Sequence, residues 1–197
     1  KKVLSTIFLK SVDFFANNKE IMDQFFESKE LELNKLYEKY KGDDLQEVIK
    51  NRLEGSFNKE DILNEKTGEF VLESEELIDE IGIEKLIENK VEKIYYWEVK
   101  PEDRIIANSL IHDHTKTSDE AVVEVFKKLR PGDLVTVDSA RSLLKQMFFN
   151  PQRYDLANVG RYKINKRLKL DLPENEITLT KEDVMQTINY VRNLYND

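Results

Sequence analysis

The sequence contains no cysteine, so disulfide bonds and thiolate zinc sites are excluded and nothing argues for an oxidising compartment. Proline and glycine are also scarce, with four and six residues in 197, which is not the composition of a disordered chain. No apolar run approaches the roughly 18 residues that a bilayer span requires, and residues 1–5 lack a signal-peptide core. We therefore predict a folded, cytoplasmic chain without a membrane segment. Because it opens at Lys1 without Met, we expect a fragment of a longer polypeptide.

Charge is abundant and unevenly distributed. Charged residues make up 36% of the chain, and the formal net charge is −8. Residues 1–110 carry 17 Lys and Arg against 26 Asp and Glu, whereas residues 141–169 carry 8 against 1. A local cationic strip on an acidic chain favours an anionic partner.

The apolar pattern predicts an α+β, mainly helical fold. Residues 5–53 read as helices with acidic surfaces, and apolar pieces on either side of the Lys66-Thr67-Gly68 turn predict a β-hairpin over residues 61–72. Residues 93–99 favour a further strand because they are rich in aromatic and β-branched side chains. We therefore expect two domains: a helical domain of residues 1–54 and 101–197, and a small α+β insert of residues 55–100.

Three threonines predict helix starts in the second half of the chain. Thr117 opens a capping box with Glu120, Thr136 can cap the next helix, and Thr180 stands three residues before Asp183. Each is followed by apolar residues at helical spacing, so the chain after Pro101 is expected to be helical.

The cationic strip is the main candidate binding site. Cations that neutralise phosphates release condensed counterions, so such a cluster would bind nucleic acid with a steep salt dependence. Tyr154 and Tyr162 lie among the cations and could stack on an unpaired base or pack beneath Arg. The alternative is a solvated basic face that pairs with the chain's own carboxylates. The cations of the strip are Arg153, Arg161, Lys163, Lys166, Arg167 and Lys169.

Other chemistry-bearing patterns are weaker. The His112-Asp113-His114 triplet could hold a metal, but surface or capping roles are the favoured reading. No phosphate-loop, dinucleotide, nucleophile-elbow or zinc-protease motif occurs, and no clustered aspartates suit two-metal chemistry. Tyr96 and Trp97 are candidates for a protein-docking patch, with core packing as the favoured alternative.

The strip also resembles a known family. Residues 148–168 are similar to the F-F-x-x-x-R-Y-D-L-x-x-V-G-R-x-K-x-N-[K/R]-x-L segment of the β subunit of bacterial DNA-directed RNA polymerase. Residues 121–149 resemble the family's E-I-Y-x-x-L-R-P-G-[E/D] passage and the helix after it, and residues 2–9 and 21–26 resemble the segment before. The likeness covers more than half of the chain and is weakest over residues 27–104, where the hairpin is similar to an insert of some lineages.

The resemblance implies a non-catalytic lobe of the β subunit, with residues 55–100 as a lineage-dependent insert. In that family the lobe lines the downstream DNA channel of a transcribing nucleotidyltransferase, and it meets DNA, the σ initiation factor and lobe-binding regulators. The β′, α and ω subunits are further expected partners, and no membrane is. The catalytic Mg²⁺ is implied to be held by aspartates of β′, so no cofactor and no catalytic residue is expected in this chain.

Carried over by position, the motif cations become DNA-contact candidates, with Tyr154, Asp155 and Tyr162 in supporting roles. We therefore expect a DNA-channel module. The rival hypothesis is a docking module for a transcription factor, in which Tyr96 and Trp97 make the contact and the cations are structural. The full set of DNA-contact candidates is Arg153, Arg161, Lys163, Lys166 and Arg167.

Overall fold

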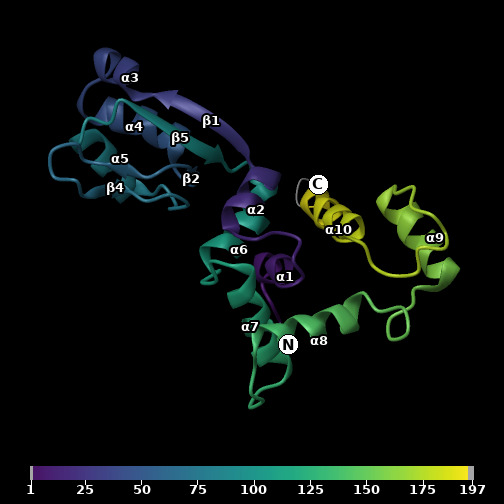
Figure 1. Ribbon diagram of the computed structural model, residues 1–197. Coiled ribbons are helices and arrows are strands. Elements are labelled where there is room, and N and C mark those ends of the chain that lie inside the picture. The colour runs from purple at the N-terminus through teal and green to yellow at the C-terminus, as the bar shows by residue number, and fades with distance from the viewer. Residues whose placement is uncertain (1, 195–197) are drawn as a thin grey trace. The chain divides into compact units, whose positions relative to one another are not determined.

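The computed structural model describes residues 2–194, which fall into two compact units (Figure 1). Unit 1 consists of residues 1–18 and 108–197, and unit 2 of residues 19–107. Two helices cross the boundaries: α2 (Asn18–Phe25) leads into unit 2, and α6 (Arg104–Ile111) leads out of it after the short 3-10 helix η1 (Pro101–Asp103). In the described part of the chain, no helix has both the length and the apolar character needed to cross a bilayer.

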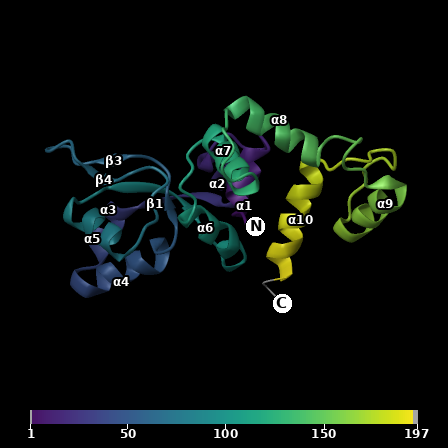
Figure 2. The same cartoon turned by 90° about the horizontal axis from the view of Figure 1, so that it is seen from below.

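Unit 2 is built on a three-stranded antiparallel sheet of order β1-β5-β2. The central strand β5 (Lys93–Glu98) pairs with β1 (Glu27–Glu32) on one side and with β2 (Phe57–Asn58) on the other. A separate hairpin joins β3 (Ile62–Leu63) to β4 (Phe70–Leu72), and Figure 2 shows the two strands side by side. The predicted strand at 93–99 and the predicted hairpin are therefore confirmed.

Apolar side chains from the helices of unit 2 form its core. In α4 (Gly42–Leu53), Leu45, Ile49 and Leu53 recur every four residues, so they share one face of the helix and all are buried. Gly82 lies on α5 (Glu80–Glu88), where an added Cβ would stand 3.2 Å from Leu72 Cδ2, so the absence of a side chain lets α5 approach β4 closely. The remaining helix of unit 2 is α3 (Leu33–Lys39).

Unit 2 is wider than the predicted insert of residues 55–100. The difference comes from β1, which pairs along its full length with β5 and brings α3 and α4 into the same unit. The sequence of β1, Glu-Ser-Lys-Glu-Leu-Glu, has a composition depleted in strands, and its pairing with β5 overrides this local preference. Whether residues 55–100 are lineage-dependent stays a prediction.

Unit 1 has a helical core of α1 (Ser5–Ser11), α7 (Ser118–Leu129) and α8 (Val137–Phe148). Ile7 packs among buried side chains of α7 and α8, including Val122 and Leu144. The predicted caps at Thr117 and Thr136 are confirmed: Thr117 Oγ1 accepts from the backbone N–H of Glu120, and Thr136 forms a capping box with Ser139. The predicted reciprocal bond from Glu120 goes instead to the backbone N–H of Lys116, at 2.7 Å. Two further helices, α9 (Ala157–Leu168) and α10 (Lys181–Leu194), complete the unit.

Candidate nucleic-acid interface

The cationic strip folds mainly as α9. Its start is organised by Asp155, whose Oδ1 accepts a hydrogen bond of 2.6 Å from the backbone N–H of Ala157. Leu156, the residue before the first residue of α9, donates its backbone N–H to the carbonyl of Ile177 at 2.8 Å. At the other end, Lys169 adopts the left-handed conformation that commonly closes helices. Asp155 therefore makes a local contact at the start of α9, and its supporting role toward DNA-contacting cations stays a prediction.

Helical spacing divides the strip between two faces. Lys166 and Arg167 lie three and four residues after Lys163, so the three share a face, and all three are exposed. Tyr162, 55% exposed, lies at the edge of the same face. Ile164 and Leu168 lie on the opposite face, where they are half-buried and line an apolar cavity with side chains of α10. We call the exposed surface of Tyr162, Lys163, Lys166 and Arg167 the outer face of α9.

Arg161 does not belong to the outer face, and the expectation that it contacts DNA is wrong for this structure. Its side chain is fully buried, and Nη1 forms an ion pair of 2.6 Å with Asp183 Oδ1. Nε donates to the carbonyl of Glu176 at 2.6 Å, and Nη2 donates to that of Thr178 at 2.5 Å. The physical reason is position on the helix, because residue 161 faces the same side as Ile164 and Leu168.

The cations of the outer face lack carboxylate partners among the described residues. Lys166 Nζ lies 6.0 Å from the centre of the Tyr162 ring, and the Arg167 guanidinium lies 5.0 Å from that of Tyr190 on α10. Such contacts with ring faces orient a cation without neutralising it. The positive charge of this face is therefore available to an anionic partner.

Arg153 and Tyr154 lie on the turn before α9. Both backbone N–H groups donate to the carbonyl of Asn150 at 2.9 Å, and both side chains are exposed, that of Tyr154 to 41%. The structure thus places Arg153 within the same unit as the outer face and leaves its charge accessible.

The docking candidates in unit 2 are buried. Trp97 is fully buried and Tyr96 is 6% exposed. Trp97 Nε1 donates to Asp23 Oδ1 at 2.9 Å, and Lys59 Nζ lies 5.3 Å from the indole centre. The expected docking patch is therefore wrong at these two residues, because β5 is the central strand and the ring of each residue is covered.

The histidine triplet does not form a metal site among the described residues. Asp113 is buried against Lys10, with 3.0 Å between Oδ2 and Nζ. Burial raises the pKa of Asp113, but hydrogen bonds from Thr115, Thr6 and Lys10 outweigh it and leave the pKa below its ordinary value. Lys10 therefore neutralises the carboxylate that a metal would need.

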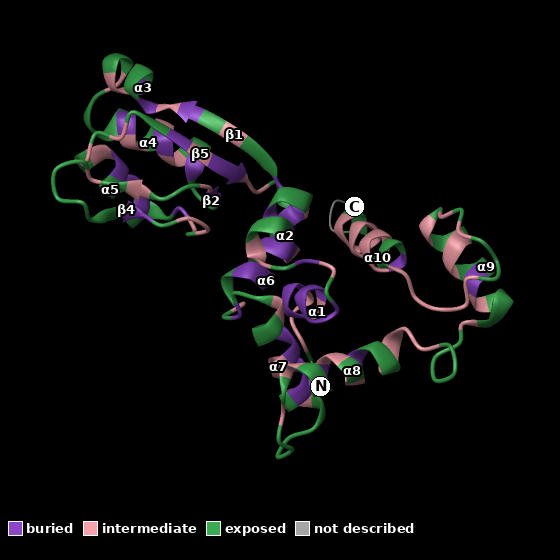
Figure 3. Cartoon of the chain, viewed as in Figure 1, coloured by how far each residue is buried: buried purple, intermediate pink, exposed green. Residues whose placement is uncertain are grey.

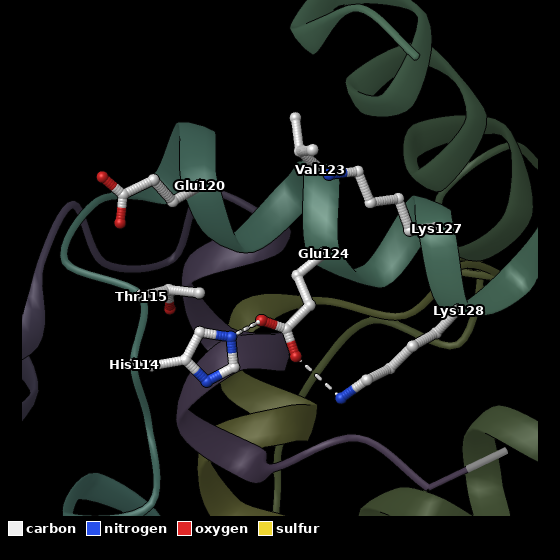
Figure 4. Close-up of a pocket in the computed structure, with 7 residues that line it drawn as sticks. All are labelled: His114, Thr115, Glu120, Val123, Glu124, Lys127 and Lys128. Carbon is white, nitrogen blue, oxygen red and sulfur yellow. Dashed lines mark ion pairs between the residues drawn. The ribbon is translucent and has the colours of Figure 1, made fainter. Parts of the chain in front are cut away.

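His114 lies in a separate surface hollow of 530 Å³ (Figure 4). There it pairs with Glu124, whose other oxygen accepts from Lys128 at 2.7 Å. His112 Nδ1 lies 2.8 Å from the carbonyl of Asn108, so the two imidazoles serve different local contacts.

Asp183 is the residue that the sequence interpretation missed at this site. The sequence indicates Asp183 only as the residue three positions after the predicted helix cap Thr180. That cap is confirmed, because Thr180 Oγ1 accepts from the Asp183 N–H and Asp183 Oδ2 accepts from the Thr180 N–H. Its second role, as the partner of Arg161, has no local signal because the two residues are 22 positions apart.

Comparison with known proteins adds an independent line of evidence. Residues 101–197 match the family model described as RNA polymerase Rpb2, domain 2. The whole chain is 65% identical to part of the DNA-directed RNA polymerase subunit beta of Fusobacterium nucleatum, and it covers 17% of that protein. The corresponding protein of Bacteroides thetaiotaomicron is 32% identical over the whole chain, which covers 16% of it. That of Syntrophotalea carbinolica is 36% identical over 73% of the chain.

Proposed function

The chain belongs to the family of bacterial RNA polymerase β subunits, of which it is a lobe segment, and from this premise we propose that it lines the downstream DNA channel and contacts DNA through the outer face of α9. The chain spans about a sixth of the length of the relatives it matches. Assembly with β′, α and ω, and contact with the σ factor, are parts of the same proposal. The catalytic Mg²⁺ is expected in β′, so this chain contributes surface and not reaction chemistry.

The observation that carries the proposal is the outer face itself. Lys163, Lys166 and Arg167 are exposed, share one side of a helix and lack carboxylate partners in the described part of the chain, although the whole chain has a net charge of −8. An acidic protein that keeps three adjacent cations unpaired has a local field suited to phosphate. Arg153 on the preceding turn extends the same charge.

Unit 2 does not share this property. It contains 14 Lys and Arg against 25 Asp and Glu, a net charge of −11, whereas unit 1 has a net charge of +3. Phosphate would therefore be repelled by unit 2 as a whole. The rival docking hypothesis loses its proposed contact residues because Tyr96 and Trp97 are buried, although Arg161 is structural as that hypothesis expects of the cations.

Titration of the chain with a fork-junction DNA oligonucleotide at several salt concentrations tests the proposal. Each phosphate neutralised contributes about 0.9 to the slope of log affinity against log salt on duplex DNA. The Lys163→Ala, Lys166→Ala double variant should lower both the affinity and the slope. The matched control is Lys66→Ala, Lys85→Ala in unit 2, where both lysines are exposed and remote from the strip in sequence. Equal losses in the two double variants would contradict the proposal.

A further inference from the structure

We propose that Arg161 is a positioning residue: it fixes the orientation of α9, and thereby of the outer face, through Asp183 and two backbone carbonyls, without touching DNA itself. The inference rests on the proposed function of that face. It assigns to Arg161 a different task from that of its neighbours in the same basic string, although residues 161, 163, 166 and 167 look alike in sequence.

The geometry around Arg161 is that of a clamp. Three nitrogens of one planar group each donate a hydrogen bond. Two of the acceptors, the carbonyls of Glu176 and Thr178, lie on the segment that returns from α9 to α10, and the third, the carboxylate of Asp183, lies in the first turn of α10. A guanidinium is rigid and always charged, so it holds its acceptors in fixed directions. Lysine, with a single ammonium on a flexible stem, does not reproduce this arrangement.

Asp183 connects the clamp to the start of α10. One oxygen, Oδ1, accepts a hydrogen bond from Arg161 Nη1. The other, Oδ2, accepts from the backbone N–H and from the hydroxyl of Thr180. The same carboxylate therefore caps α10 and pairs with α9. It is 2% exposed, so the charge of Arg161 is matched inside the protein and is not shared with solvent.

Two further hydrogen bonds tie α9 to the returning segment on either side of the clamp. The Leu156 N–H donates to the carbonyl of Ile177 at 2.8 Å, and Asn165 Nδ2 donates to the carbonyl of Leu172 at 2.7 Å. Arg161 lies between these two contacts in sequence and is the only one of the three donor residues that carries a charge. Its charge-assisted hydrogen bonds are therefore stronger than those of Leu156 and Asn165.

Apolar packing alone does not fix this helix. Ile164 and Leu168 are only half-buried, and most residues of α9 are exposed, as Figure 3 shows in green. In α7, by contrast, Ala121, Val122, Val125 and Phe126 are all buried. Because α9 has so little apolar burial, its orientation depends on polar contacts, and Arg161 supplies three of them.

The salt dependence of DNA binding separates this role from direct contact. Three phosphate contacts on the outer face contribute about 2.7 to the magnitude of the wild-type slope, and Lys163→Ala should lower it by about 0.9. Arg161→Ala should lower the slope as far as the triple variant Lys163→Ala, Lys166→Ala, Arg167→Ala does. Adding Lys163→Ala to Arg161→Ala should then change nothing further. If Arg161 instead met phosphate directly, Arg161→Ala would lower the slope by only about 0.9. The losses caused by Arg161→Ala and Lys163→Ala would then add in the double variant.

Arg161→Lys controls for simple loss of the fold. It keeps the positive charge and one contact with Asp183, so circular dichroism should report an intact helix while the slope still falls by more than about 0.9. A slope equal to that of the wild type in this variant, or a loss of about 0.9 in Arg161→Ala, would overturn the assignment.

Hydrogen exchange of the free chain keeps the two proposals distinguishable. Amides of α9 should exchange faster in Arg161→Lys than in the wild type, while those of α7 stay unchanged. If the wild type shows no salt-dependent binding, the DNA proposal fails and the exchange data still test the clamp. Unchanged exchange in α9 would contradict the positioning role whatever the DNA result.

Discussion

Unit 2 and the α9–α10 segment of unit 1 are held together by different forces. Unit 2 has a continuous apolar core to which the helices α4 and α5 and the strands β4 and β5 all contribute. The α9–α10 segment has mostly half-buried apolar residues, and its fully buried side chains are those of Arg161 and Asp183. The acidic unit is therefore held by apolar burial, whereas the cationic helix depends on a polar clamp that leaves its outer face free.

The first prediction concerns the apolar core of unit 2. Trp97→Ala removes a fully buried ring from the central strand, so the free energy of unfolding of unit 2 should fall by about 3–5 kcal/mol. Denaturant unfolding measures the loss. Ile81→Ala, at a position 62% exposed, is the control and should change stability by less than about 0.5 kcal/mol. If the two variants unfold alike, the apolar core is not what holds unit 2.

The second prediction concerns the clamp. Asp183→Ala leaves the Arg161 charge buried and unpaired and also removes the cap of α10, so unit 1 should lose about 3–5 kcal/mol. Glu182→Ala, at an exposed neighbouring position of α10, serves as the control. Replacing both partners together, as Arg161→Met with Asp183→Leu, should restore most of the stability because no unpaired charge remains. A double variant as unstable as Asp183→Ala would contradict the ion-pair interpretation.

The third prediction is a dependence on acid. Because the folded-state pKa of Asp113 lies below the ordinary value of 3.8, its contribution is fully present above that value and is lost as the pH falls through the folded-state pKa. The free energy of unfolding of unit 1 should therefore drop by up to about 1.4 kcal/mol per pH unit below about pH 4 from this group alone. Asp113→Asn should flatten that part of the pH profile, and an unchanged profile would exclude Asp113 as its source.

The smallest expected effect concerns the aromatic edge of the outer face. Tyr162 is 55% exposed beside Lys166, so it is available to stack on an unpaired base. Tyr162→Ala should weaken binding to fork-junction DNA by about 1 kcal/mol and leave binding to blunt duplex unchanged, because paired bases do not expose their faces. Equal losses on both DNAs would show that the ring serves only to pack under Lys166.

Local patterns predicted much of the fold. The caps at Thr117, Thr136 and Thr180 rest on contacts within three residues, and the hairpin rests on one turn, so both could be predicted from the sequence. Strand β1 could not, because its charged sequence forms a strand only through pairing with β5, more than sixty residues away.

The site was predictable to a smaller extent. The strip was identified correctly as a concentration of cations, but a basic string does not reveal which members face inward. Arg161 is buried because Asp183 and the carbonyls of Glu176 and Thr178 meet it there, and none of these partners is signalled near residue 161. Lys163, Lys166 and Arg167 needed no partner to remain exposed, so their contact with DNA stays a prediction that the structure permits.

The central claim is that the outer face of α9 meets DNA while unit 2 does not, and hydrogen exchange of the chain with and without fork-junction DNA at low salt tests it most directly. The account predicts slower exchange in α9 and in the turn at residues 153–156, with unit 2 unchanged. Slower exchange in unit 2, with α9 unaffected, would contradict it.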